Sequence, residues 1–182
     1  PFWEEHSIDR ECGGYLTCLD RYGRVTDERK YVWFQARQVW TFSALYDLLE
    51  PRERWRAAAE HGLRFLLERC YAGNGVWHFQ LSREGRVEKA AVSVFSDLYA
   101  ALALAAFAKA FGDGRAREAA LVTWRSVLAR LADPDFAGYY PQAEDMSMRC
   151  HSVSMMKTMA GLELERCVSE AEAGRTVDEA TH

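Results

Sequence analysis

An arginine placed between two tryptophans is the part of this sequence whose residue types point most directly to chemistry. Arg37 lies in the stretch KYVWFQARQVWTFSALYDLL, which covers residues 30–49. Aromatic rings can stack on the apolar C–H faces of sugars, and a guanidinium offers fixed donors to hydroxyl or carbonyl oxygens. The pattern predicts a sugar-binding surface with four candidate residues: Trp33, Gln35, Arg37 and Trp40. The alternative is an amphipathic helix whose arginine is solvated or ion-paired.

The apolar pattern of the same stretch predicts the helix that positions these side chains. Its apolar and small residues recur at intervals of three and four, as on one face of an α-helix: Val32, Trp33, Ala36, Val39, Trp40, Ser43, Ala44 and Leu48. Asp27 is predicted as the N-cap of this helix. The same analysis predicts further helices over residues 52–70, 93–111, 115–131 and 148–167.

Two short β-hairpins are predicted in the connections between the helices. Residues 15–19 are β-prone and precede a Tyr-Gly turn, and residues 76–81 alternate in polarity and precede a Glu-Gly turn. Long helices joined by short returns favour antiparallel neighbours. The sequence therefore predicts an all-α fold of antiparallel helix pairs with short β-hairpins in the loops.

Length and composition restrict the class of protein. The chain has 182 residues, of which 49% are hydrophobic and 13% aromatic, which suits one domain with a sizeable core. The net charge is −4 and no basic block is present, so we expect no nucleic-acid partner. The longest apolar run, residues 100–108, is too short to span a bilayer, so we expect no membrane partner.

The cysteines give no sign of a disulfide framework or a metal site. Their number is five, which is odd, and no two of them form a CxxC pair. Reduced thiols are typical of cytosolic proteins. We therefore expect no metal and a cytoplasmic location.

Several segments resemble, in order, the N-terminal half of the N-acylglucosamine 2-epimerase family: HSIDRECGGYLTCLDRYGRV, KYVWFQARQVWTFSALY, GVWHFQLSREG and SVFSDLYAALALAAFAKAFG. The family also holds cellobiose 2-epimerases, sugar-sulfonate isomerases and mannose isomerases. The resemblance implies an (α/α)6 barrel, a toroid of antiparallel helix pairs, and a cytoplasmic sugar isomerase or epimerase without a metal. For members related to renin-binding protein it also implies activation by a nucleotide such as ATP, and homodimers.

The length of the chain limits what the resemblance implies. A complete barrel of this kind has twelve helices, whereas the sequence predicts five. We therefore expect an incomplete (α/α)6 barrel over residues 1–166, followed by a polar tail over residues 167–182, with apolar surface left exposed. One of the family's two catalytic histidines lies in the C-terminal half, so we expect an N-terminal fragment that is inactive alone.

The resemblance also implies roles for individual residues. Arg37 matches the arginine of the family's Gln-x-Arg motif, which would bind the sugar's ring or carbonyl oxygen, where negative charge develops when the C2 proton leaves. Asp97 matches a family motif and is either a substrate contact or a buried structural acceptor. Tyr99 lies either in the core or in the cavity. One of the two tryptophans is expected to face the cavity and the other to pack in the core.

His151 is the candidate base in this part of the chain. Epimerisation at C2 needs a group that takes a weakly acidic C–H proton, and histidine suits this because its pKa lies near working pH. Some family members carry a histidine at the start of the corresponding helix, although Ser154 takes that place in the alignment. The alternative is a loop or capping histidine.

These observations support one main hypothesis and two alternatives. The main hypothesis is a sugar 2-epimerase or isomerase that acts on a reducing sugar such as N-acylglucosamine, with Arg37 stabilising the enediolate. The first alternative is a non-catalytic helical interaction module. The second is an inverting glycoside hydrolase on the same kind of barrel, which needs two carboxylates about 6.5–9.5 Å apart. Its candidates are Asp97 with Glu144 or Asp145.

Overall fold

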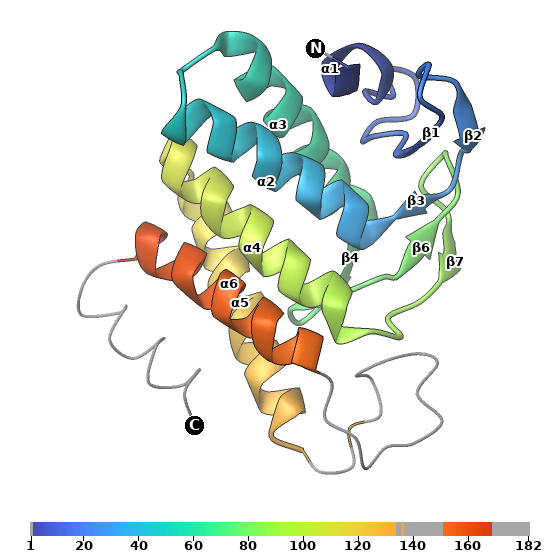
Figure 1. The fold of residues 1–182 in the computed structure, drawn as a ribbon. Helices are drawn as coiled ribbons and strands as arrows, with labels where there is room; N and C mark the ends of the chain where they lie inside the picture. Colours follow the sequence, from blue (N-terminus) through green and yellow to red (C-terminus); the bar gives the residue numbers. More distant parts are fainter. Residues whose placement is uncertain (1, 134–135, 137–150, 169–182) are drawn as a thin grey trace.

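The computed structural model describes residues 2–133, 136 and 151–168. In this part of the chain, parallel helices form one layer, and helices that run in the opposite direction cover it (Figure 1). The helices are α1 (Phe2–His6), α2 (Val32–Leu48), α3 (Glu53–Phe65), α4 (Val94–Phe111), α5 (Gly114–Leu131) and α6 (His151–Cys167), and a π-helical turn, η1 (Leu66–Cys70), extends α3. The strands are β1 (Cys18–Leu19), β2 (Val25–Asp27), β3 (Lys30–Tyr31), β4 (Tyr71–Gly73), β5 (Val76–Trp77), β6 (Gln80–Leu81) and β7 (Val87–Lys89).

Helices α2, α4 and α6 run in the same direction and form the inner layer. Trp33 meets Tyr99 in the first half of α2 and α4, and Tyr46 meets Phe111 near the ends of both, with ring centroids 5.8 and 4.8 Å apart. Two side-chain links between α2 and α6, described below, also advance along both helices in the same sense. Helices α3 and α5 return in the opposite direction and cover one side of this layer (Figure 1).

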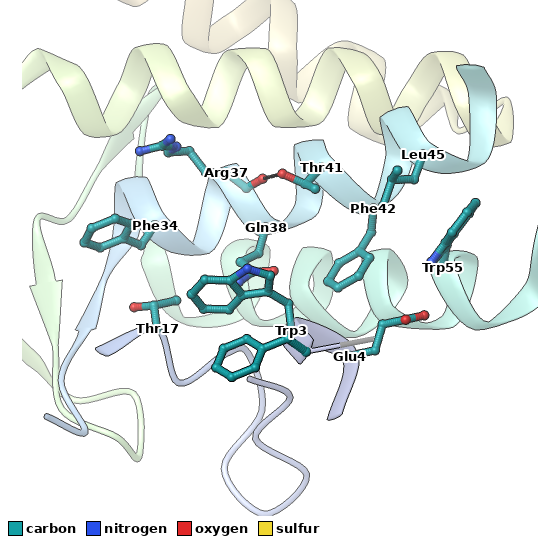
Figure 2. A pocket seen from close by; sticks show the side chains of 11 residues that line it. Trp3, Glu4, Thr17, Phe34, Arg37, Gln38, Thr41, Phe42, Leu45 and Trp55 are labelled. Atoms are coloured by element: carbon teal, nitrogen blue, oxygen red, sulfur yellow. Dashed lines mark hydrogen bonds between the residues drawn. The ribbon is translucent and has the colours of Figure 1, made fainter. Parts of the chain in front are cut away.

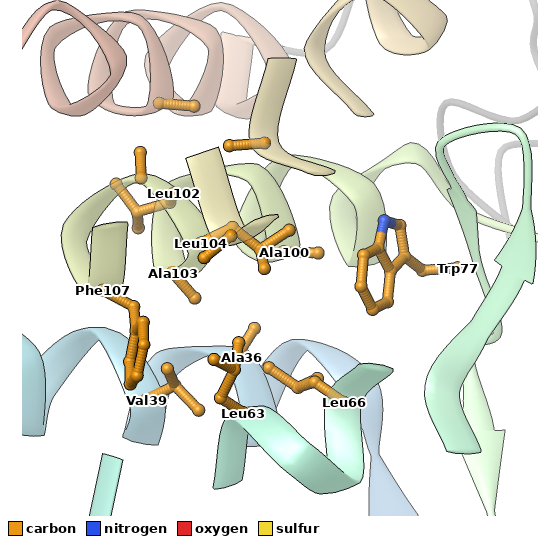
Figure 3. Close-up of a cluster of buried hydrophobic side chains, with 14 of the residues drawn as sticks. Ala36, Val39, Leu63, Leu66, Trp77, Ala100, Leu102, Ala103, Leu104 and Phe107 are labelled. Atoms are coloured by element: carbon orange, nitrogen blue, oxygen red, sulfur yellow. The ribbon is translucent and has the colours of Figure 1, made fainter. Parts of the chain in front are cut away.

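Helix α4 is the centre of the core because α2, α5 and α6 all pack against it. Ser93 caps its start by accepting a hydrogen bond from the Phe95 N–H, and Gly112, in the left-handed region at φ 68°, ends it. Figure 3 shows side chains of α2, α3 and η1, among them Val39, Leu63 and Leu66, converging on α4.

Among the described residues, α4 is the helix that is long and apolar enough to cross a membrane by composition, and 72% of that window is buried inside the structure. Burial of this extent is expected of a core helix whose apolar faces are covered by neighbours on several sides.

The helices of the structure confirm those predicted from the apolar periodicity, with ends that differ by a few residues. Both predicted hairpins are confirmed, since β1 pairs with β2 and β6 pairs with β7. Two local details differ from the prediction. Residues 76–81 are divided between two strands, because β5 pairs with β4 while β6 pairs with β3 and β7. Asp27 does not cap α2: it ends β2, and its carboxylate accepts hydrogen bonds from Arg29. The N-cap is Tyr31, in an extended conformation, and the Val32 N–H donates to the Phe79 carbonyl of the neighbouring loop.

A buried lysine ties the N-terminal loop, the start of α2 and the β6–β7 turn together. The Lys30 Nζ donates to Asp9 Oδ2 at 2.8 Å, to the Gly13 carbonyl at 2.6 Å and to the Arg83 carbonyl at 2.7 Å. The Arg83 Nε donates to the same Asp9 oxygen at 3.1 Å. The side chain of Lys30 is 0% exposed and that of Asp9 is 1% exposed. A charge this deep is tolerated because its partners replace the lost water.

The charge of Asp9 makes this cluster sensitive to acid. Burial by itself would raise the pKa of Asp9, but hydrogen bonds from Arg83 and Lys30 outweigh it and hold the pKa well below its usual range. A carboxyl with a depressed pKa stabilises the fold above its unfolded value of about 3.9, and this stabilisation is lost as the pH falls below that value.

We predict that Asp9→Asn lowers the free energy of unfolding at pH 7 by about 3 kcal/mol or more, because Lys30 is left with carbonyl acceptors alone. Urea unfolding at pH 7 and melting temperatures between pH 7 and pH 3 measure this, and the loss of stability below about pH 4 should be shallower in the variant. Asp27→Asn is the matched control, since its pair with Arg29 is partly exposed and should be worth about 1 kcal/mol or less. Equal effects of the two substitutions would contradict the prediction.

Candidate functional site

The candidate site lies on the side of the inner layer that is turned away from α3 and α5, here called the open face. Its defining residues are Trp33, Arg37 and Trp40 of α2, Tyr99 of α4 and Glu163 of α6. In α2 the fully buried side chains pack against neighbouring elements, whereas the three open-face side chains are half-buried or exposed. They share one side of the helix because four- and three-residue steps return to the same face.

Arg37 is held between two aromatic rings. Its Cζ lies 5.8 Å from the centroid of the Trp33 ring and 5.7 Å from that of the Tyr99 ring, and these two rings are themselves 5.8 Å apart. Cation–π contact restricts the guanidinium without using its N–H donors. Within the described part of the chain, the guanidinium of Arg37 has no ion pair and donates no hydrogen bond. A fixed cation with free donors is suited to an oxygen that carries or develops negative charge.

Trp40 lies deeper on the same face and contacts α6. Its Nε1 donates to the Oε2 of Glu163 at 3.4 Å, and Arg166 donates to the Oε1 of Glu163 at 2.6 Å. Sequence analysis did not single out Glu163. The sequence pattern could have indicated it, because Glu163 falls among the buried positions of α6, between Ala160 and Leu164. A carboxylate at such a position usually has a specific partner.

Gln35 does not contribute to the open face, contrary to the expectation from the sequence. Its side chain is fully buried, accepts a hydrogen bond from the Tyr15 N–H at 2.8 Å and donates one to the Tyr15 carbonyl at 2.8 Å. Gly14 has φ +65°, and a Cβ there would come within 2.6 Å of the Gln35 Oε1. Gln35 therefore fixes the N-terminal loop to α2 and has no exposed atom for a ligand.

Asp97 has the geometry of the buried structural acceptor. Its side chain is 1% exposed, and it accepts hydrogen bonds from the Trp77 N–H at 2.7 Å and from Arg130 at 3.0 Å. Burial raises the pKa of Asp97 to about 6, against the lowering effect of Arg130 and of the Trp77 N–H. The residue connects β5, α4 and α5, and it does not face the open site.

His151 is the first residue of α6 and is exposed to solvent. Because α2 and α6 are parallel, the start of α6 lies toward the same end of the layer as the start of α2. At a rise of about 1.5 Å per residue, His151 lies roughly 18 Å along the axis from Glu163. The structure thus places His151 at the end of the inner layer where α2 also begins, and its contact with substrate stays a prediction. Glu144 and Asp145 lie outside the described residues.

A separate hollow of about 540 Å³ lies between α1, α2 and α3 (Figure 2). The indole of Trp3 occupies its middle, below Phe34 and Gln38, and the guanidinium of Arg37 points away from Trp3, toward α4. The lining is mainly apolar: Phe2, Trp3, Glu4, Thr17, Phe34, Arg37, Gln38, Thr41, Phe42, Leu45 and Trp55. This hollow therefore shares Arg37 with the open face, but the guanidinium points away from its centre (Figure 2).

Among the residues that the structure describes, no three His, Cys, Asp or Glu side chains gather as metal ligands would. The open face offers donors from the guanidinium of Arg37, the hydroxyl of Tyr99 and the indole of Trp33, whereas the indole N–H of Trp40 is engaged by Glu163.

Comparison with known proteins decides the family. The sequence profile described as N-acylglucosamine 2-epimerase (GlcNAc 2-epimerase) matches residues 14–172. The chain belongs to the N-acylglucosamine 2-epimerase family. Human N-acylglucosamine 2-epimerase is 34% identical over 184 residues, which cover 95% of this chain and 43% of the human protein. Cellobiose 2-epimerase of Bacteroides fragilis is 30% identical over 124 residues, which cover 64% of this chain and 30% of that protein.

Solved structures identify the fold of this family member. The cellobiose 2-epimerase of Spirochaeta thermophila superposes with a TM-score of 0.78 at 24% identity, over 99% of this chain and 48% of that one. The prediction of an incomplete (α/α)6 barrel is therefore confirmed, with α2, α4 and α6 as inner helices and α3 and α5 as outer ones. The chain spans less than half the length of the curated relatives it matches.

We predict that Gln35→Met destabilises the fold without affecting a sugar site. The substitution leaves the N–H and the carbonyl of Tyr15 buried without partners, which should cost about 2–5 kcal/mol. Chemical denaturation measures the loss. Gln38→Met, at a half-buried position of the same helix that makes no such clamp, should change stability by about 0.5 kcal/mol or less. If Gln35→Met weakened sugar binding at unchanged stability, the structural assignment of Gln35 would be wrong.

Proposed function

We propose that the protein is a sugar 2-epimerase that acts on a reducing sugar of the N-acylglucosamine type by proton transfer at C2. The observation that carries this proposal is the guanidinium of Arg37, which lies between the rings of Trp33 and Tyr99 on the open face and has no ion pair within the described residues. Membership of the family and 34% identity to the human N-acylglucosamine 2-epimerase support it.

The chemistry requires an open-chain sugar with a carbonyl at C1. A base removes the C2 proton, the C–H electron pair forms the C1–C2 double bond, and the carbonyl π pair moves to the C1 oxygen as negative charge. Arg37 donates to that oxygen and stabilises the charge as it develops. Return of a proton to the opposite face of C2 restores the carbonyl and inverts the centre. Within the described residues His151 is the candidate for the base or the acid, since histidine exchanges protons near neutral pH.

The alternatives predict different arrangements or outcomes. An inverting glycoside hydrolase needs a carboxylate that can reach substrate, and Asp97 is buried and paired with Arg130. A non-catalytic interaction module would leave the proton at C2 in place. The exchange of that proton with solvent therefore separates an epimerase from both alternatives.

The test is incubation of the full-length gene product in deuterated water with N-acetylmannosamine, N-acetylglucosamine or cellobiose, with and without ATP. We expect deuterium to appear at C2 of at least one sugar above a heat-killed control, as mass spectrometry and NMR would detect. Absence of exchange with all three sugars under both conditions would contradict the proposal.

We predict that Arg37→Lys lowers kcat on the order of 100-fold, because lysine keeps the charge but loses the planar fork that contacts the oxygen at two points. The melting temperature should stay close to that of the parent, since Arg37 has no ion pair to lose within the described residues. Arg56→Lys, on the outer helix α3 and paired with Glu60, is the matched control and should leave kcat unchanged. An unchanged kcat in Arg37→Lys would show that Arg37 has no catalytic role.

A further inference from the structure

Two side-chain links connect α2 and α6 across the open face. The first joins the Nε1 of Trp40 to Glu163 at 3.4 Å, and the second joins Arg166 to Asp47 at 2.7 Å. Arg166 also donates to Glu163 at 2.6 Å, so the four side chains form one continuous network. The network lies deeper along the inner helices than Arg37, which is one helical turn before Trp40.

Small residues on α4 make room for these links. Tyr99 occupies the open face of α4 beside Trp33, but the positions four and seven residues further on are Ala103 and Ala106, which are 0% and 3% exposed. Side chains at these spacings lie on the same side of a helix. Because α4 offers only methyl groups there, the long side chains of α2 and α6 can meet above it.

The position of Glu163 is costly for a carboxylate. The residue is 9% exposed, and among the described residues Trp40 is the partner of Oε2 and Arg166 the partner of Oε1. A buried ion pair is rarely more stabilising than well-packed apolar side chains of the same volume, so stability alone does not account for it. What an apolar residue cannot supply is an acceptor for the indole N–H, which fixes the direction of the ring.

We propose that Glu163 is a positioning residue that holds the indole of Trp40 as the floor of the sugar site. The indole then presents an apolar surface to sugar C–H groups one helical turn below the guanidinium that binds the carbonyl oxygen. The assignment rests on the proposed sugar-epimerase function, and it adds a residue of α6 to a site otherwise built from α2 and α4.

The test is fluorine NMR of the full-length protein labelled with 5-fluorotryptophan, in which Trp40→Phe assigns the Trp40 resonance. Titration with N-acetylmannosamine should shift this resonance. Glu163→Leu should move it before sugar is added and raise the Kd on the order of tenfold, as for loss of one aligned aromatic contact. Glu163→Gln keeps an acceptor for the indole and should restore the Kd to within about threefold of the parent.

Two controls separate positioning from a general effect on the fold. Asp47→Ala removes the acceptor of the second link and leaves the Trp40–Glu163 bond in place, and Glu165→Leu removes a carboxylate from the same helix outside the network. Both should leave the Trp40 resonance and the Kd unchanged. A Kd in Glu163→Leu equal to that of the parent, or a Trp40 resonance that sugar does not shift, would overturn the proposal.

The same samples distinguish this proposal from the function on which it rests. A sugar that shifts Trp40 in the expected pattern while no deuterium enters C2 would refute the epimerase and support the positioning of Trp40. Deuterium exchange with no response of Trp40 would support the epimerase and refute the role of Glu163.

Discussion

The packing of α4 between α2, α5 and α6 is the constraint on which the rest of the structure depends. An apolar helix covered on several sides fixes the direction and spacing of its neighbours, and it leaves one side of the inner layer free of an outer helix. The residues of the candidate site are the side chains that each inner helix presents on this open face. On α2 the steps from Trp33 to Arg37 and from Arg37 to Trp40 keep one face, and on α4 Tyr99 meets it.

The local hydrophobic pattern of the sequence predicted the helices well, but it did not predict contacts between residues that are far apart in the sequence. The periodicity that defines α2 and α4 is contained in each segment, so it could be predicted without knowing the neighbours. The burial of Lys30 could not be predicted in this way, because its partners come from the N-terminal loop and from the β6–β7 turn. Asp27 was missed for a local reason, because it was predicted as a helix cap and its carboxylate instead accepts hydrogen bonds from Arg29, two residues further on.

The candidate site also contains residues that the sequence predicted correctly and residues that only the contacts of the structure could assign. Gln35 and Arg37 were both predicted to bind sugar, but residues two apart on a helix point about 200° away from each other, so they cannot share a face. In the structure Arg37 lies on the open face, whereas both polar groups of the Gln35 side chain are hydrogen-bonded to the backbone of Tyr15. Asp97 and Glu163 are both buried acids in neighbouring inner helices, and their partners distinguish their roles. Asp97 is paired with Arg130 of α5 and is a structural anchor, whereas Glu163 accepts from Trp40 and belongs to the open face.

The central claim is that the open face, with Arg37 between Trp33 and Tyr99, receives the reacting end of a sugar. The most direct measurement is a crystal structure of the full-length protein with the reduced, open-chain alditol of N-acetylglucosamine, which cannot be epimerised. The account predicts that the oxygen on C1 lies about 2.7–3.2 Å from the guanidinium of Arg37. Alditol bound in the hollow between α1, α2 and α3, with the open face vacant, would contradict it.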